Sequence, residues 1–197
     1  KGKEGENITG IGSATHELGH IFGLPDLYNT VEGNGGLLGW SLMANGSFNN
    51  ESRTPPCLTA FEREWLDWGE AEVLTAPGEY SLAPIESNQF YRINTSNPDE
   101  YFLLENRQQK GWDAYIGGHG LLIYHIDLSR PEVFTNNQVN GDKEHQYVNL
   151  LEADGNAHWD DYAGDTFPGS TGKTSFGDDT FPSSILWSGE RLGKSIS

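Results

Sequence analysis

The 197-residue sequence has a single cysteine and few basic side chains, with 12 Lys and Arg against 29 Asp and Glu. Cys57, being alone, cannot form an internal disulfide. A formal net charge of −17 leaves no basic face for the phosphates of nucleic acid or of anionic membranes. No apolar run approaches the roughly 20 residues that cross a bilayer, so we expect no membrane span. These absences disfavour nucleic acid and lipid as partners.

Glycine and aromatic residues are plentiful instead, with 25 glycines and 12% aromatics. Large aromatic side chains bury enough area to build a core despite the polar composition. In residues 1–72 the spacing of apolar residues predicts helices and a long loop. After residue 73 the apolar residues have the spacing of strands. We therefore predict an α+β fold in which the β-rich residues 73–197 pack on residues 1–72 as one module.

Two helices are predicted in the first part. Gly23 and Pro25 end the first helix, because glycine favours a left-handed cap and proline cannot continue the turn. Thr59 and Glu62 have the spacing of a capping box for the second helix, which we expect to end at Gly69. In the second part, strands are predicted over residues 79–83, 90–94, 100–105, 120–127 and 147–152.

The stretch THELGHIFGLPD contains the candidate metal-binding and catalytic residues. On a helix, His16 and His20 lie one turn apart on one face, where two imidazoles can bind one Zn²⁺. Glu17 lies one step round the helix and suits a general base acting on metal-bound water. A bare His-Glu-x-x-His also arises by chance on a solvated helix. Here Gly23 permits a sharp turn that lets the Asp26 carboxylate return to the histidines, and Asp26 replaces the last histidine of the metzincin pattern.

The only methionine of the chain, Met43, follows Asp26 by 17 residues in the stretch WSLMANG. Metzincins place a methionine in a tight turn beneath the zinc, where its thioether packs under the histidine ligands. Taken alone, Met43 is equally well explained as core filler. Behind an extended zinc motif, the sequence predicts the role of a methionine turn.

These residues resemble a known family. HELGHIFGLPDLY and WSLM look like the immune inhibitor A-type secreted bacterial metallopeptidases, which are metzincin-like zinc enzymes. The likeness continues over residues 58–69, 101–108, 118–127 and 165–170. The resemblance implies a fold in which residues 1–72 are the lower part of a zincin catalytic domain, holding the zinc helix, the methionine turn and a C-terminal helix.

The resemblance also implies a function. It is that of a zinc-dependent endopeptidase that hydrolyses peptide bonds in protein or peptide substrates through a glutamate-activated, metal-bound water. It assigns the zinc ligands to His16, His20 and Asp26, catalysis to Glu17 and the methionine turn to Met43. It further implies a secreted or cell-surface location and a place within a longer polypeptide.

One feature departs from the zincin pattern. In zincins a mixed sheet precedes the zinc helix, and its edge strand holds the substrate backbone. Only 15 residues precede His16 here. We therefore expect that upper, substrate-binding sheet to be largely absent from this chain, which would leave an incomplete and poorly active cleft.

Two alternatives from other classes remain open. The chain could be a non-catalytic surface binding module that retains a metalloprotease scaffold, or its metal could be purely structural. The intact Glu17 disfavours the first alternative, because a decayed enzyme often loses its base. Three protein ligands disfavour the second, because structural zinc sites are usually closed by four.

A second metal is suggested by an acidic, turn-rich region. Asp154, Asp160, Asp161 and Asp165 offer hard oxygen ligands of the kind that suit structural Ca²⁺. Aspartate is equally the default residue of turns, and no EF-hand spacing is present. The sequence leaves both interpretations open.

Two pairs of charged residues share a strand face. Glu105 and Arg107 have the same parity on one predicted strand, which favours a structural ion pair. His125 and Asp127 have the same parity on another, and we expect a hydrogen-bonded core pair there rather than a metal site.

Overall fold

The computed structural model describes residues 3–4, 7–8, 10–32, 35–156 and 162–197. Its α-helices are α1 (Gly12–Phe22), α2 (Asn49–Ser52), α3 (Ala60–Trp65) and α4 (Pro131–Thr135). The 3₁₀ helices are η1 (Leu38–Trp40), η2 (Asn45–Phe48), η3 (Ile85–Ser87), η4 (Gly111–Tyr115) and η5 (Tyr162–Gly164). The strands are β1 (Lys3–Glu4), β2 (Asn7–Ile8), β3 (Glu72–Val73), β4 (Tyr91–Asn94), β5 (Glu100–Arg107), β6 (Gly120–Asp127) and β7 (Val148–Leu150). This arrangement confirms the predicted α+β class.

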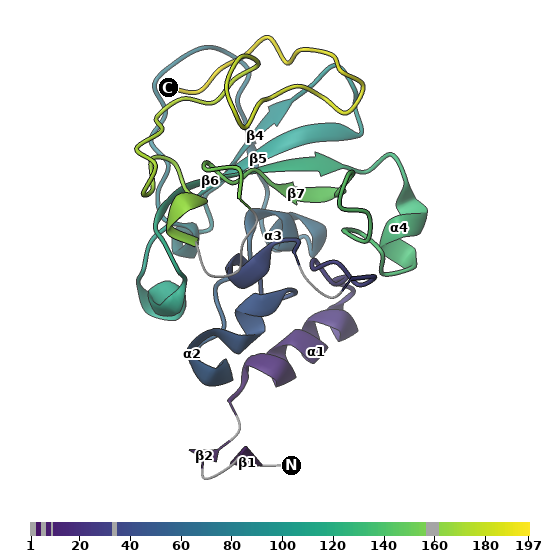
Figure 1. Ribbon diagram of the computed structural model, residues 1–197, viewed down its shortest axis with the longest axis vertical. Helices are drawn as coiled ribbons and strands as arrows, with labels where there is room; N and C mark the ends of the chain where they lie inside the picture. Colours follow the sequence, from purple (N-terminus) through teal and green to yellow (C-terminus); the bar gives the residue numbers. More distant parts are fainter. Residues whose placement is uncertain (1–2, 5–6, 9, 33–34, 157–161) are drawn as a thin grey trace.

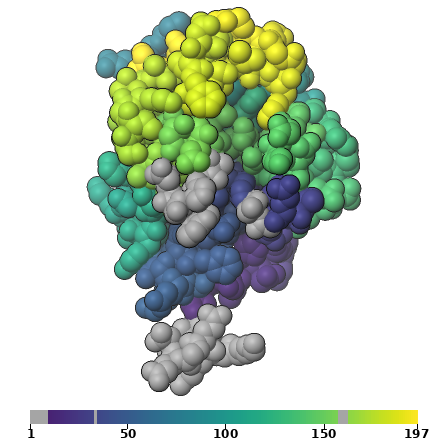
Figure 2. Space-filling view, in the orientation of Figure 1, coloured from purple at the N-terminus to yellow at the C-terminus, as the bar shows by residue number. Residues whose placement is uncertain are grey.

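A five-stranded sheet in the order β3-β4-β5-β6-β7 forms the centre of the molecule (Figure 1). The β3–β4 pair is parallel and the other pairs are antiparallel, with Leu103 of β5 opposite Tyr124 of β6. In Figure 1 the N-terminal helices lie below this sheet, and the yellow C-terminal segment lies above it. Figure 2 shows the same C-terminal segment covering the end of the molecule opposite α1.

The central strands β5 and β6 are largely buried on both faces, and their successive side chains point to opposite sides of the sheet. On one face, Leu103 and Tyr124 join a core with residues of the N-terminal part, among them Phe61. On the other face, Phe102 packs with Phe176 and other residues of the C-terminal segment. The strands are therefore largely apolar along their length. The helices pack on one face of the sheet, and the C-terminal segment packs on the other.

One predicted strand is absent, and the predicted end of one helix is wrong. No strand forms over residues 79–83, because side chains rather than a neighbouring strand take the backbone groups of this segment. The Gln89 side chain accepts from the Ala83 N–H, and the Tyr91 hydroxyl donates to the Ser81 carbonyl. The second helix has the predicted capping box but ends at Trp65 instead of Gly69, and a positive φ of 55° at Asp67 breaks the helical path.

The zinc-motif helix α1 turns an apolar stripe to the outside. Leu18, Ile21 and Phe22 are all exposed, with Ile21 at 79%. The buried positions of α1 are instead Gly12 and Gly19, which allow the helix to approach the chain beneath it closely. Among the helices of the described residues, none combines the length and the apolar character that crossing a membrane requires.

The strand pairs predicted from parity have different outcomes. The ion pair of Glu105 and Arg107 is confirmed, with 2.9 Å between Glu105 Oε1 and Arg107 Nη1. His125 does not pair with Asp127, because each has a better-placed partner on another segment. His125 Nε2 lies 2.7 Å from Glu100 Oε1, and Asp127 Oδ2 lies 2.8 Å from His145 Nε2.

Candidate metal centre

The end of α1 reverses the chain toward its own histidines. Gly23 has φ 100°, and Leu24 N–H donates back to the Gly19 carbonyl at 3.0 Å, so the helix closes with a left-handed glycine cap. The following loop is held in place by two further bonds. Trp65 Nε1 donates to the Gly23 carbonyl at 2.9 Å, and the N–H of Leu27 donates to the Met43 carbonyl at 2.8 Å. Asp26 lies between these two anchors.

The three predicted ligands converge on one point. Asp26 Oδ1 lies 3.1 Å from His16 Nε2 and 3.3 Å from His20 Nε2. Among the described residues, His16, His20 and Asp26 form the only group of three or more metal-binding side chains with ligand atoms this close. Tetrahedral zinc with bonds of about 2.0–2.2 Å separates its ligand atoms by about 3.4 Å. The observed separations therefore fit a shared zinc ion.

The second nitrogen of each ring fixes its tautomer. His16 Nδ1 lies 2.9 Å from the Leu42 carbonyl, and His20 Nδ1 lies 2.9 Å from the Leu24 carbonyl. A carbonyl can only accept a hydrogen bond, so each Nδ1 carries the proton and each neutral ring turns a lone pair on Nε2 toward Asp26. Asp26 Oδ1 is itself buried and receives no hydrogen bond. Three electron-rich atoms that meet in this way require a cation or a proton between them.

The pKa shifts follow from this convergence. A protonated His16 would donate to Asp26, and this bond and the Asp26 charge raise the pKa of His16, with burial only partly opposing the effect. Burial would raise the pKa of Asp26, but the same bond from protonated His16 and the hydrogen bond from Asn137 outweigh it and lower that pKa. Without metal, a proton on His16 therefore serves the same electrostatic need. Because zinc must displace that proton, metal binding at this group releases protons.

The Met43 side chain packs against the zinc-motif helix α1. This side chain is fully buried, and its sulfur lies against Gly19, the residue of α1 directly before His20. A Cβ at Gly19 would come within 2.4 Å of Met43 Sδ, a distance that real Cβ contacts do not show. This contact is compatible with the predicted methionine turn, which stays a prediction.

Replacing Gly19 with Ala should destabilise the protein by about 1–3 kcal/mol, although alanine ordinarily favours a helix interior by about 1 kcal/mol. The reason is the overlap between the new Cβ and the buried Met43 sulfur. Urea unfolding of the metal-free protein measures the change. In a double-mutant cycle with Met43→Leu, the cost of Gly19→Ala should shrink. Equal costs in both backgrounds would place the strain elsewhere.

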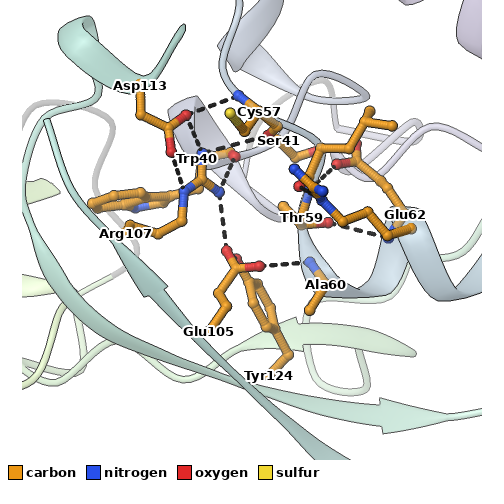
Figure 3. Close-up of polar contacts among 12 residues, drawn as sticks. Trp40, Ser41, Cys57, Thr59, Ala60, Glu62, Glu105, Arg107, Asp113 and Tyr124 are labelled. Carbon is orange, nitrogen blue, oxygen red and sulfur yellow. Dashed lines mark hydrogen bonds and ion pairs between the residues drawn. The ribbon is translucent and has the colours of Figure 1, made fainter. Parts of the chain in front are cut away.

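A buried glutamate holds the methionine turn (Figure 3). Glu62 Oε1 accepts from Ser41 Oγ at 2.6 Å and from the Met43 N–H at 3.1 Å, while Oε2 accepts from the Thr59 N–H at 2.6 Å. Burial raises the pKa of Glu62, and these bonds only partly compensate. The capping glutamate of α3 is therefore also the support of the turn beneath the histidines, a second role that its sequence spacing does not reveal.

A buried arginine joins this turn to the sheet (Figure 3). Arg107 forms a bidentate pair with Asp113 at 2.7 Å for both contacts, and a further bond with Glu105 at 2.9 Å. Its remaining N–H groups donate to the carbonyls of Trp40, at 3.0 Å, and Cys57, at 3.4 Å. Trp40 directly precedes the methionine turn. The network therefore extends from β5 to the support of the metal centre.

The comparison with protein families concerns the same part of the chain. Residues 5–70 match the family model of the immune inhibitor A peptidase M6 catalytic domain. The resemblance drawn from the motifs is thereby confirmed over these residues. No curated protein and no solved structure matches the chain.

The peptidase M6 match suggests a protease and covers the histidines, Glu17, Asp26 and Met43. The family likeness of residues 101–108, 118–127 and 165–170 lies outside the matched range and stays a prediction. So does the individual role of each site residue. The family is zinc-dependent, which agrees with the geometry of the group formed by His16, His20 and Asp26.

The residues predicted to bind calcium have other partners where the structure describes them. Asp165 Oδ2 accepts from Trp40 Nε1 at 2.7 Å, and Asp154 Oδ1 accepts from the Asn156 N–H at 2.9 Å. Asp160 and Asp161 lie outside the described residues, so the calcium site stays a prediction.

The sequence did not single out Glu152, whose pKa is raised to about 8 by burial, with the charges of Asp165 and Asp154 adding to the effect.

Two further residues near the metal centre escaped the sequence analysis. Burial raises the pKa of the Tyr28 phenol, and the negative charge of Asp26 adds to the shift. Asn137, from the segment after α4, bonds directly to Asp26. Tyr28 is close enough in sequence to have been suspected. Asn137 lies 111 residues from Asp26, and no sequence spacing points to it.

Proposed function

We propose that this chain carries the metal centre of a zinc-dependent endopeptidase that hydrolyses peptide bonds in protein substrates. The observation that carries the proposal is the convergence of one buried Asp26 oxygen with two histidine nitrogens at 3.1 and 3.3 Å. These residues lie in the segment that matches the peptidase M6 catalytic domain. His16, His20 and Asp26 would hold the zinc.

Zinc bound at this group would polarise the scissile carbonyl and make a water more acidic. The chain itself supplies the proton transfers. Glu17, exposed on α1 next to His16, accepts a proton from the attacking water and then returns it to the leaving amine. His20 is the most exposed ligand at 31% of its side chain, so substrate and water approach from its side.

Two rival functions make different predictions. A non-catalytic binding module would have no need for an acid at the position of Glu17, and the sequence retains one. A purely structural zinc would have four protein ligands, whereas three side chains converge among the described residues. Both observations favour the peptidase. We further propose, from the family alone, that the protein is secreted or exposed at the cell surface as part of a longer polypeptide.

Cleavage of unfolded casein tests the proposal. The full-length protein, loaded with zinc, should cleave casein, lose the activity on treatment with a chelator and regain it when zinc is added back. His16→Ala should abolish both zinc binding and cleavage, whereas His119→Ala, which changes an exposed histidine outside the centre, should leave both intact. A wild type that binds zinc but leaves casein intact over long incubation would contradict the peptidase and favour the binding module.

A further inference from the structure

The metal centre receives a contact from outside the segment that matches the peptidase family. Asn137 Nδ2 donates to Asp26 Oδ2 at 2.7 Å, and Asn137 Oδ1 accepts from the Asp26 N–H at 2.7 Å. One amide therefore binds both the side chain and the backbone of the proposed third ligand. The family match ends at residue 70, so this contact belongs to the second part of the chain.

The two carboxylate oxygens of Asp26 therefore have different surroundings. Asn137 occupies Oδ2, while Oδ1 is left without a hydrogen bond and faces the two histidines. A carboxylate on a loop could otherwise rotate, turn either oxygen toward the metal, or swing to solvent. Fixing one oxygen from a neutral donor holds the other in position without adding charge to the ligand set.

The backbone at Asn137 is adapted to this contact. Its φ of 55° is left-handed, a conformation that asparagine tolerates better than most residues. Thr30 Oγ1 donates to the Asn137 carbonyl at 2.9 Å, so the loop around Asp26 holds Asn137 in return. Aspartate would keep the shape of Asn137 but place a second negative charge against Asp26 Oδ2. Glycine would keep the backbone conformation and remove the amide.

The segment that carries Asn137 is itself firmly placed. Phe134 of α4 stacks on Trp65 of α3, with ring centroids 5.0 Å apart. Trp65 in turn binds the Gly23 carbonyl at the end of the zinc-motif helix. Asn140, three residues after Asn137, donates to the carbonyls of Leu27 and Val148 at 3.0 and 2.9 Å. The segment can therefore act as a rigid arm against the ligand loop.

We propose that Asn137 is a positioning residue for the zinc centre and that the affinity of residues 16–26 for zinc depends on this contact from the second part of the chain. The proposal rests on the metal centre proposed above. Partners of this kind, one bond removed from the metal, change metal affinity by about 10–100-fold when they are lost. The segment that matches the peptidase family then forms an incomplete zinc site without the β-rich part of the chain.

Zinc affinity, measured by competition with a chromophoric chelator, tests this proposal. Asn137→Gly and Asn137→Asp should each raise the zinc Kd by about 10–100-fold. The absorption of a bound Co²⁺ ion should change in the same variants, because it reports the geometry of the ligands. Asn136→Gly and Asn136→Asp are the matched controls, since they make the same chemical changes at the exposed residue directly before Asn137. They should keep the zinc Kd within about twofold of the wild type.

The outcomes separate this proposal from the peptidase. A zinc Kd in Asn137→Gly that stays within about twofold of the wild type would overturn the positioning role. An equal loss of affinity in the Asn136 variants would overturn it too, because the effect would then come from the charge or backbone of this segment and not from the Asn137 amide. A wild type that binds no zinc overturns both proposals. If the wild type binds zinc without cleaving casein and Asn137→Gly still weakens binding, the positioning role holds and the peptidase falls.

Discussion

Replacing Glu17 with Gln should lower kcat for casein cleavage by about 10²–10⁴-fold, which is the usual contribution of a general acid–base residue. Glutamine has nearly the shape of glutamate but cannot accept the proton of the attacking water at neutral pH. Glu17 lies exposed on α1 beside His16, outside the group formed by the three proposed ligands. The zinc Kd should therefore stay close to the wild-type value, and KM should change little.

The matched control for this substitution is Glu79→Gln, which makes the same chemical change at an exposed position far from the zinc motif in sequence. It should cleave at the wild-type rate. Steady-state kinetics on casein and zinc titration of both variants make the comparison. If Glu17→Gln turned over as fast as the wild type, Glu17 would not be the base. If it lost zinc together with activity, Glu17 would act on the metal instead of on the proton.

The convergence of His16, His20 and Asp26 could be predicted from the sequence, because it depends on distances along one helix and one turn. The helical spacing of His16 and His20 and the glycine bend before Asp26 act over fewer than a dozen residues. The structure brings all three side chains together. The capping box of Thr59 and Glu62 was predictable for the same reason.

The supports of the centre could not be predicted in this way. Asn137 reaches Asp26 across 111 residues, and Glu62 reaches the Ser41 side chain across 21. Such contacts depend on how α3, α4 and the sheet pack, and no short-range period records that packing. The wrong pairing of His125 with Asp127 has the same origin. The alternation of side chains along β6 predicted that both residues share one face of the strand. Each instead pairs with a residue of another segment, His125 with Glu100 and Asp127 with His145.

The exposed stripe of α1 shows a further limit. Apolar residues at helical spacing predict an amphipathic helix, and the helix is present, but the apolar side is not the buried one. Leu18 and Phe22 face outward because the inner face is taken by the histidines and by Gly19 above Met43. Chemistry and close backbone packing, rather than hydrophobicity, decide the orientation of this helix.

Arg107→Met should lower the free energy of unfolding by about 3–5 kcal/mol, the largest stability loss that we expect from a single substitution here. The Arg107 side chain is completely buried, as are the side chains of its partners Glu105 and Asp113. Glu105 and Asp113 outweigh burial and hold the pKa of Arg107 above its usual value, so the group is charged in the folded state. Its removal leaves two carboxylates in the core without their cation (Figure 3).

The loss should extend to the turn that contains Met43. Arg107 binds the Trp40 carbonyl, and Glu105 binds the Ala60 N–H at the start of α3 at 2.5 Å and the Tyr124 hydroxyl at 2.7 Å. One substitution therefore disturbs β5, the entry to α3 and the chain that leads to Met43. For this reason the zinc Kd should rise along with the loss of stability.

Urea unfolding with a set of variants distinguishes charge from packing. Arg53→Met removes an exposed arginine whose partner is the exposed Glu51, and it should leave the urea midpoint unchanged. The triple change Arg107→Met, Glu105→Gln and Asp113→Asn should recover part of the lost stability, because it removes the buried charges together with their cation. If the triple variant were less stable than Arg107→Met alone, hydrogen bonding rather than uncompensated charge would account for the loss. If Arg107→Met itself unfolded like the wild type, the network would contribute nothing to the support of the metal centre.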